Sequence, residues 1–250
     1  MSVMESKPVL VVRSLLFWVF FTFNVLVFGL LIVFLFFTSS SFRLKIARLW
    51  SNINNLLLKI FCGIDFKVAG RENLNVKTAI ILSKHQSTWE TLALHSFTPY
   101  VHWVFKRELM YIPIFGWALA LTDPIGINRG AGRAAIKQLI TQGKQKLDNG
   151  KWMVLFPEGT RTAPGKTKKY KIGGALLAEK SGYPIIPIAH NAGEFWPRHS
   201  FIKWPGTISV VIGPAIESKG RSADEINKEV CDWIEGTMQE IGDESRWNRA

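Results

Sequence analysis

Two residues with the chemistry of a general base and its orienting group, His85 and Glu90, stand five positions apart in the sequence. A carboxylate that accepts a hydrogen bond from an imidazole fixes the tautomer of the ring and stabilises its protonated form. Residues five apart in a regular helix point about 140° away from each other. The two side chains therefore meet only if His85 lies in a turn and Glu90 lies in the first turn of the following helix.

The same stretch also fits a purely structural role. Ser87-Thr88-Trp89-Glu90 matches the S-x-x-E pattern of a capping box, with which many ordinary helices begin. Taken alone, this window favours a helix cap beside a surface histidine, and the catalytic interpretation depends on what the rest of the chain contains.

Three further groups of polar residues follow apolar runs that are typical of strands. They are Lys106-Arg107-Glu108, Asn128-Arg129-Gly130 and Phe156-Pro157-Glu158-Gly159-Thr160-Arg161. Arg129 and Arg161 are suited to holding a phosphate, because a guanidinium group is a planar bidentate donor. Gly159 permits a ligand to approach the backbone closely. Each group alone is common in surface loops, but their occurrence after successive strands favours a binding site.

Strands and helices alternate from about Asp65 onward, which predicts an α/β fold with a mixed, partly parallel sheet flanked by helices. Because open α/β sheets bind ligands at the carboxyl ends of their strands, we expect the four polar groups at one edge. The expected strands are Phe66–Val68, Thr78–Ser83, Val101–Phe105, Pro124–Ile127, Trp152–Phe156, Pro184–Ala189 and Thr207–Ile212. The expected helices are Thr88–Ser96, Ile114–Leu121, Ala131–Leu147, Ile172–Lys180 and Ala223–Ile241, the last with a second capping box at Ser222 to Glu225.

The N-terminal part of the chain predicts a membrane-embedded helix. Ser14 to Phe37 is a run of 24 residues without a charge, about 36 Å long as a helix against roughly 30 Å of bilayer hydrocarbon. From Ile46 to Phe61, apolar residues recur at helical spacing, which predicts an amphipathic helix at the membrane interface or, alternatively, on the core of the soluble domain. We therefore expect membrane-embedded and interfacial helices in residues 1–62 and one α/β domain in residues 63–250.

Charge restricts the partners and the orientation. The net charge of +12 and the pI of about 9.8 favour anionic partners. Arg43, Lys45 and Arg48 follow the apolar run, which places its C-terminal side in the cytoplasm. The basic residues are dispersed and no nucleic-acid-reading motif is present, so we expect no nucleic-acid partner. The histidines and cysteines lack metal-ligand spacing, and no metal is assigned. The absence of a G-x-x-x-x-G-K-[ST] loop disfavours a nucleotide hydrolase.

Taken together, the four blocks resemble the lysophospholipid acyltransferase family, in particular its bacterial 1-acyl-glycerol-3-phosphate acyltransferases. The resemblance covers about Phe66 to Pro214 and the N-terminal helices. It rests on His85 to Glu90 for the family's H-x-x-x-x-D block, on Lys106-Arg107-Glu108-Leu109 through Pro113 and Gly116 to Arg129, on the unbroken F-P-E-G-T-R block at Phe156–Arg161, and on Ile186-Pro187-Ile188. Two residues depart from the family pattern: Glu90 replaces an aspartate, and Lys84 stands where an asparagine often precedes the histidine.

The resemblance implies acyl transfer from a thioester, acyl-CoA or acyl-acyl carrier protein, to the sn-2 hydroxyl of lysophosphatidic acid, with no further cofactor. His85 is then the general base and Glu90 its orienting group. Lys106, with a backbone N–H near Gly159, is the expected oxyanion stabiliser. The expected phosphate ligands are Arg129 and Arg161, with Glu158 and Thr160 ordering the loop, although turn structure is an equal alternative for Glu158. The implied location is the bacterial inner membrane, with the catalytic domain on the cytoplasmic side.

Two other functions fit parts of the sequence. One is acyl transfer to a different lysolipid, such as a lyso-amino-acid lipid or lysocardiolipin, because the blocks carry the chemistry and not the whole acceptor headgroup. The other is non-catalytic binding of anionic lipid by the same basic residues, which leaves His85 and the unbroken third block without a role.

Overall fold

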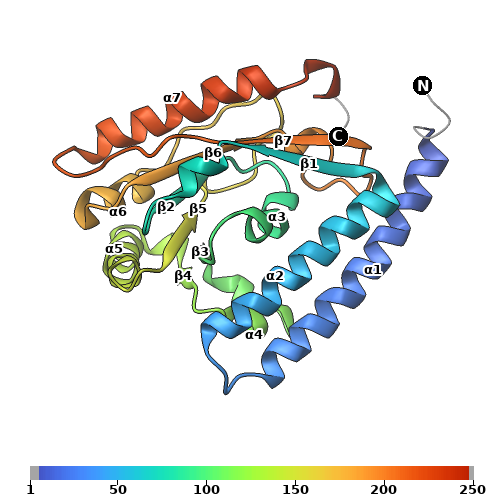
Figure 1. Cartoon of the computed structure of the whole chain (residues 1–250), viewed down its shortest axis with the longest axis horizontal. Helices are drawn as coiled ribbons and strands as arrows, with labels where there is room; N and C mark the ends of the chain where they lie inside the picture. The colour runs from blue at the N-terminus through green and yellow to red at the C-terminus, as the bar shows by residue number, and fades with distance from the viewer. Residues whose placement is uncertain (1–5, 248–250) are drawn as a thin grey trace.

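A sheet of seven strands forms the centre of the fold in the computed structural model, which describes residues 6–247 (Figure 1). The termini of the two predicted domains, residues 1–5 and 248–250, lie outside the described residues. The strands are β1 (Ile64–Ala69), β2 (Ile80–Ser83), β3 (Val101–Lys106), β4 (Ile125–Ile127), β5 (Trp152–Leu155), β6 (Ile185–His190) and β7 (Gly206–Ile212). Every strand expected from the sequence is present.

The sheet is mixed, as predicted, with the order β1-β7-β6-β2-β5-β3-β4. The five strands from β6 to β4 are parallel to one another, and β7 joins them through antiparallel pairing with β6. β1 completes the sheet by pairing with β7 in parallel. Because all five parallel strands end at the same edge, the loops after β2, β3, β4 and β5 come together there.

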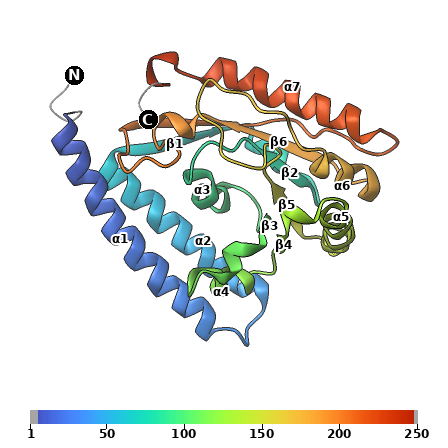
Figure 2. The same ribbon diagram turned by 180° about the vertical axis from the view of Figure 1, so that it is seen from behind.

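Helices cover both faces of the sheet and build two separate hydrophobic cores (Figure 1, Figure 2). Successive strand residues such as Ile81 and Leu82 point to opposite faces and belong to different cores. On the first face lies α3 (Trp89–Phe97), together with the N-terminal helices. On the second face lie α5 (Arg133–Asp148), α6 (Gly173–Ser181) and α7 (Ala223–Ile241). The predicted capping box at the start of α7 is formed by Ser222 and Glu225.

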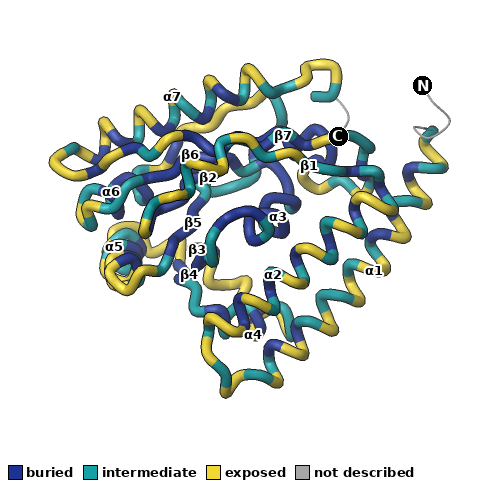
Figure 3. Tube along the Cα trace, viewed as in Figure 1, coloured by how far each residue is buried: buried dark blue, intermediate teal, exposed yellow. Residues whose placement is uncertain are grey.

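The N-terminal helices α1 (Lys7–Phe34) and α2 (Ser40–Leu57) lie side by side (Figure 1). Of the helices within residues 6–247, α1 alone is long and apolar enough to cross a membrane. One side of α1 packs on the protein, with Leu10, Phe17 and Ile32 buried, while apolar residues such as Phe23 and Leu30 are exposed (Figure 3). Such an apolar outer surface on a basic protein is typical of membrane association.

The helix α2 is amphipathic, and several of its polar residues face inward. Ser51 and Asn54 are fully buried, and the Ser51 hydroxyl hydrogen-bonds the carbonyl oxygen of Leu92 in α3. Leu49 and Leu56, which belong to the predicted apolar stripe, are instead more than half exposed. Trp50 and Leu57 of the same stripe instead pack against the first hydrophobic core. The stripe therefore lies partly on the core, as the alternative predicts, and partly on the outer surface of the protein. After α2, a π-helical turn (Leu58–Cys62) leads into β1.

Candidate active site

His85 lies in the turn between β2 and α3, and Glu90 lies in the first turn of α3. The imidazole Nδ1 is 2.7 Å from Glu90 Oε1. The Glu90 side chain is fully buried, whereas the His85 side chain keeps 16% of its surface exposed. Because Nδ1 is held by the carboxylate, Nε2 is the nitrogen of the ring that can exchange a proton with a ligand.

Glu90 also satisfies backbone groups at the start of α3. Its Oε1 accepts hydrogen bonds from the N–H groups of Gln86 at 2.9 Å and Ser87 at 3.0 Å. The longer glutamate arm therefore orients the histidine and holds the helix start together. Burial alone raises the pKa of the Glu90 carboxyl, but the His190 and His85 imidazoles and the Ser87 N–H outweigh burial and hold that pKa below its ordinary value.

The loop after β5 fixes the backbone and the ring of His85. The His85 N–H donates to Glu158 Oε2 at 2.6 Å, and the His85 carbonyl accepts from the Thr162 N–H at 2.7 Å. The Phe156 ring stacks on the imidazole, with 4.0 Å between centroids and 10° between planes. Glu158 is fully buried, and burial is the main cause that raises the pKa of its carboxyl, against the lowering effect of the Lys84 ammonium. The block at Phe156–Arg161 thus positions the block at His85–Glu90.

Lys84 points away from the imidazole of the neighbouring His85. Its ammonium lies 2.8 Å from Glu158 Oε1 and 2.7 Å from Oε1 of Glu235 in α7, and the side chain is 1% exposed. The charge that the sequence places beside the base is therefore compensated by two carboxylates on the α7 side of the sheet.

The two arginines connect the loop after β5 to two different elements. The Arg161 guanidinium donates to Thr88 Oγ1 at 2.7 Å, at the start of α3. The Arg129 guanidinium, which follows β4, donates to the carbonyl oxygen of Gly159. Gly159 has a φ of +69°, a left-handed conformation that favours glycine, and a Cβ at this position would lie 2.9 Å from the Lys171 ammonium nitrogen.

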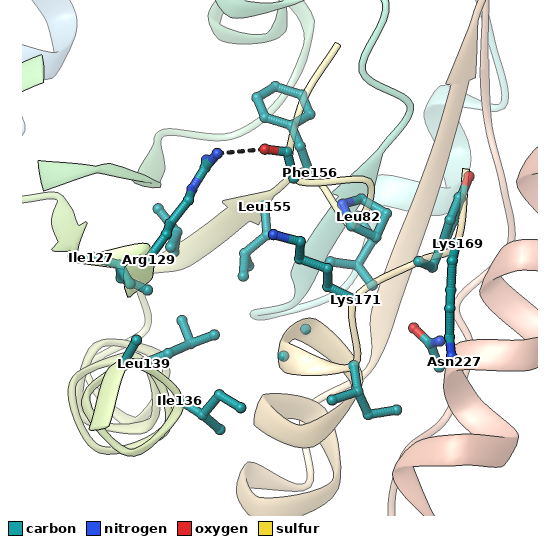
Figure 4. A pocket seen from close by; sticks show the side chains of 18 of the residues that line it. Leu82, Ile127, Arg129, Ile136, Leu139, Leu155, Phe156, Lys169, Lys171 and Asn227 are labelled. Atoms are coloured by element: carbon teal, nitrogen blue, oxygen red, sulfur yellow. Dashed lines mark hydrogen bonds between the residues drawn. The ribbon is translucent and has the colours of Figure 1, made fainter. Parts of the chain in front are cut away.

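A groove of about 790 Å³ opens beside this loop, between α5, α6 and the ends of β3, β4 and β5 (Figure 4). Its walls include Ile136 and Leu139 of α5, and Arg129, Lys169 and Lys171 supply positive charge. Phe156, which stacks on His85, also lines the groove. An apolar floor beneath cationic side chains suits an amphiphilic, anionic ligand.

Comparison with known proteins decides the family. A model of the acyltransferase family matches residues 65–191. The chain is 43% identical to the 1-acyl-sn-glycerol-3-phosphate acyltransferase of Pseudomonas aeruginosa over 236 residues, covering 92% of this chain and 91% of that protein. The chain belongs to the acyltransferase family.

More distant relatives extend the comparison. This acyltransferase is 29% identical to the 1-acyl-sn-glycerol-3-phosphate acyltransferase of Saccharomyces cerevisiae over 194 residues, 74% of this chain and 64% of that protein. Its fold matches the crystal structure of the 1-acyl-sn-glycerophosphate acyltransferase PlsC from Thermotoga maritima with a TM-score of 0.78 and 23% identity, covering 94% of this chain and 98% of that chain.

Most of the predicted site residues of the acyltransferase lie together. His85 contacts Glu90 and Glu158, and Gly159, Thr160 and Arg161 belong to the same loop, to which Arg129 attaches from β4. Lys106 at the end of β3 is half exposed and pairs with Glu108 Oε1 at 3.3 Å. Its expected role at the oxyanion stays a prediction.

Several residues that hold the site had no role in the sequence interpretation. Glu235 and Tyr170 join the Lys84 cluster from far along the chain, which no local pattern indicates. His190, which also had no assigned role, contacts the Lys84 carbonyl through Nε2 at 2.8 Å. The sequence carries one indication of this cluster, which is that Lys84 departs from the family pattern. A lysine at the end of an apolar strand needs a buried partner for its charge.

Proposed function

We propose that this acyltransferase transfers a fatty acyl group from acyl-CoA or acyl-acyl carrier protein to the sn-2 hydroxyl of lysophosphatidic acid, giving phosphatidic acid. The observation that carries the proposal is the 2.7 Å contact between His85 Nδ1 and a fully buried Glu90. The names of the Pseudomonas and yeast relatives support the choice of acceptor.

In the proposed reaction, Nε2 of His85 takes the proton of the hydroxyl as its oxygen attacks the thioester carbonyl. The carbon–sulfur bond then breaks, and the imidazolium returns the proton to the departing thiolate. Glu90 stabilises the imidazolium between the two steps. General-base help of this kind contributes about 10²- to 10⁴-fold to a rate.

The basic residues around the loop after β5 support roles in binding the substrates. In this proposal, Arg129 and Arg161 bind the phosphate of the acceptor. Lys106 and the backbone N–H near Gly159 stabilise the oxyanion. Thr160 orders the loop between them. Glu158 does not contact the acceptor in this proposal, because its buried carboxylate already accepts the His85 N–H. We therefore assign its contribution to the conformation of the loop.

The proposed acceptor is a membrane lipid, which agrees with the apolar outer surface of α1. Lysophosphatidic acid resides in a membrane, and the exposed apolar residues of α1 and α2 offer the enzyme a lipid-facing surface. Part of the proposal is that this membrane is the bacterial inner membrane, with the catalytic domain on the cytoplasmic side, supported by the basic residues that follow the apolar run.

A lysolipid panel tests the proposal. Purified enzyme in lipid vesicles is given a labelled acyl thioester and, in turn, lysophosphatidic acid, lysocardiolipin and a lyso-amino-acid lipid. We expect labelled phosphatidic acid as the main product. Preference for another lysolipid would change the acceptor, and acyl transfer to none of them would favour a lipid-binding protein. Parallel reactions with acyl-CoA and acyl-acyl carrier protein identify the donor.

A further inference from the structure

A buried charge cluster reaches His85 from the α7 side of the sheet. Lys84 lies between the carboxylates of Glu158 and Glu235, at 2.8 and 2.7 Å. The Tyr170 hydroxyl donates to the same Glu235 oxygen at 2.8 Å. Lys84, Glu158 and Tyr170 are all buried, and the Glu235 side chain is 17% exposed.

The contacts of this cluster form a chain that ends at the catalytic turn. Glu235 holds the Lys84 ammonium, the ammonium holds Glu158 Oε1, and Glu158 Oε2 accepts the His85 N–H at 2.6 Å. The two oxygens of one rigid carboxylate are thus divided between the lysine and the histidine backbone. Rotation of that carboxylate would displace the His85 peptide and, with it, the ring.

A contribution to folding stability is a poor explanation for this buried charge cluster. Removing charged groups from water is unfavourable, and apolar residues of similar size often serve at least as well in a protein interior. What a buried cluster of ion pairs and hydrogen bonds does provide is a single geometry for its members. A general base depends on that geometry, because a misplacement of about 1 Å reduces a rate on the order of 100-fold.

We infer that Lys84 and Glu235 are positioning residues for His85, so that α7 takes part in catalysis although it lies outside residues 65–191 that the family model matches. The inference rests on the proposed role of His85. Neither residue touches the imidazole, and both act through Glu158. The Lys84 carbonyl is held separately by His190, so side-chain substitutions at position 84 leave that restraint in place.

The decisive comparison uses two glutamates of α7. Glu235→Leu removes the contact with Lys84, whereas Glu235→Gln keeps an oxygen that can accept from both Lys84 and Tyr170. Glu229→Leu is the matched control, because Glu229 pairs at 2.5 Å with Arg221 on the surface and its side chain is 48% exposed. Steady-state kinetics are measured in vesicles per folded molecule, with the folded fraction determined by near-ultraviolet circular dichroism. The acceptor is whichever lysolipid the wild type acylates.

We expect Glu235→Leu to lower kcat by about 10- to 100-fold with both KM values within about twofold of wild type. Glu235→Gln should recover most of kcat, and Glu229→Leu should match the wild type. Lys84→Met should lower kcat further, because Glu158 loses its cation. If Lys84→Met does not fold, the Glu235 pair decides alone.

A folded Glu235→Leu enzyme with wild-type kcat, or one that raises KM without lowering kcat, would overturn the inference. A wrong acceptor in the proposed function is recognised from the wild type alone, which then acylates a different lysolipid. The ratio of kcat between variant and wild type for that lysolipid still tests the positioning role.

Discussion

Glu90 and Glu158 hold the same histidine from two regions of the molecule. Both side chains are fully buried. Glu90, on the α3 side of the sheet, bonds the imidazole and two backbone N–H groups of the adjoining turn. Glu158, in the loop after β5, bonds the His85 backbone and the Lys84 ammonium. The pKa of Glu90 lies below its ordinary value and that of Glu158 lies above it, although burial raises both.

Glu90 belongs to a part of the site that is built by neighbouring residues, and Glu158 to a part that is built by residues far apart in the sequence. All of the hydrogen-bond donors to Glu90 come from the three residues 85–87, so the spacing of one turn supplies them. The partners of Glu158 come from the end of β2, and its cation in turn depends on α7. The turn therefore supplies the hydrogen bond to the His85 ring, while the assembled fold supplies the Phe156 stack on that ring and the bond that holds its backbone.

The largest effect is expected from removing the histidine on which both glutamates act. His85→Ala should lower kcat for acyl transfer by about 10²- to 10⁴-fold, because the general base is lost. The measurement is turnover of labelled thioester by folded, vesicle-bound enzyme, with the exposed His199→Asn as a control. Near-normal turnover by His85→Ala would remove the base from the account and reduce both glutamates to structural roles.

A smaller and selective effect is expected at the arginine that joins the two regions, Arg161, which bonds Thr88 of the turn. Arg161→Gln should raise the KM for lysophosphatidic acid about tenfold or more, because a charge-assisted contact with phosphate is lost. The KM for the thioester should stay unchanged. Exposed Arg133→Gln serves as the control. An equal rise in both KM values would count against a phosphate role.

The smallest effect is a contrast in how stability depends on pH. The folded-state pKa of Glu90 is below 4.5, so its stabilising effect is present above the unfolded-state pKa and is lost as the pH falls through the folded-state value. The folded-state pKa of Glu158 is above 4.5, so its contribution is present at low pH and is lost as the pH rises through that value. Each unit of pKa difference between folded and unfolded states corresponds to about 1.4 kcal/mol.

Denaturant unfolding of the wild type, Glu90→Gln and Glu158→Gln at several pH values measures this contrast. The stability difference between wild type and Glu90→Gln should shrink as the pH falls below 4.5. The difference between wild type and Glu158→Gln should instead move against the wild type as the pH rises above 4.5. Slopes of the same sign would show that the two buried carboxylates do not differ in this way.

The sequence predicted the parts of this site that depend on local spacing and on sheet topology. His85, Arg129 and the block from Phe156 to Arg161 each follow a parallel strand, and parallel strands that end at one edge bring such loops together. The contact between Glu90 and His85 follows from a turn that leads directly into a helix. Glu90 orients His85 and also accepts from the Ser87 N–H. The complete capping box predicted at Ser87 to Glu90 is absent from the described residues, because the Ser87 hydroxyl accepts from the Trp89 N–H and α3 has Thr88 as its N-cap.

Contacts between residues that are far apart in the sequence could not be predicted from it. Lys84 turns toward Glu235, which is 151 positions away, and no periodicity connects the two. The inward position of some polar residues of α2 has the same origin, because Ser51 and Asn55 bond Ser96 of α3. A helical apolar stripe indicates that a helix is amphipathic but does not say which side faces the protein when the outer solvent is lipid.

A kinetic double-mutant cycle of His85→Ala, Glu90→Gln and the double variant tests most directly the claim that Glu90 acts through His85. Glu90→Gln alone should lower kcat, because the ring loses its orienting charge. If the two residues act as a unit, adding Glu90→Gln to His85→Ala should change kcat little further. Independent effects that multiply in the double variant would contradict the account and would place Glu90 at the helix start only.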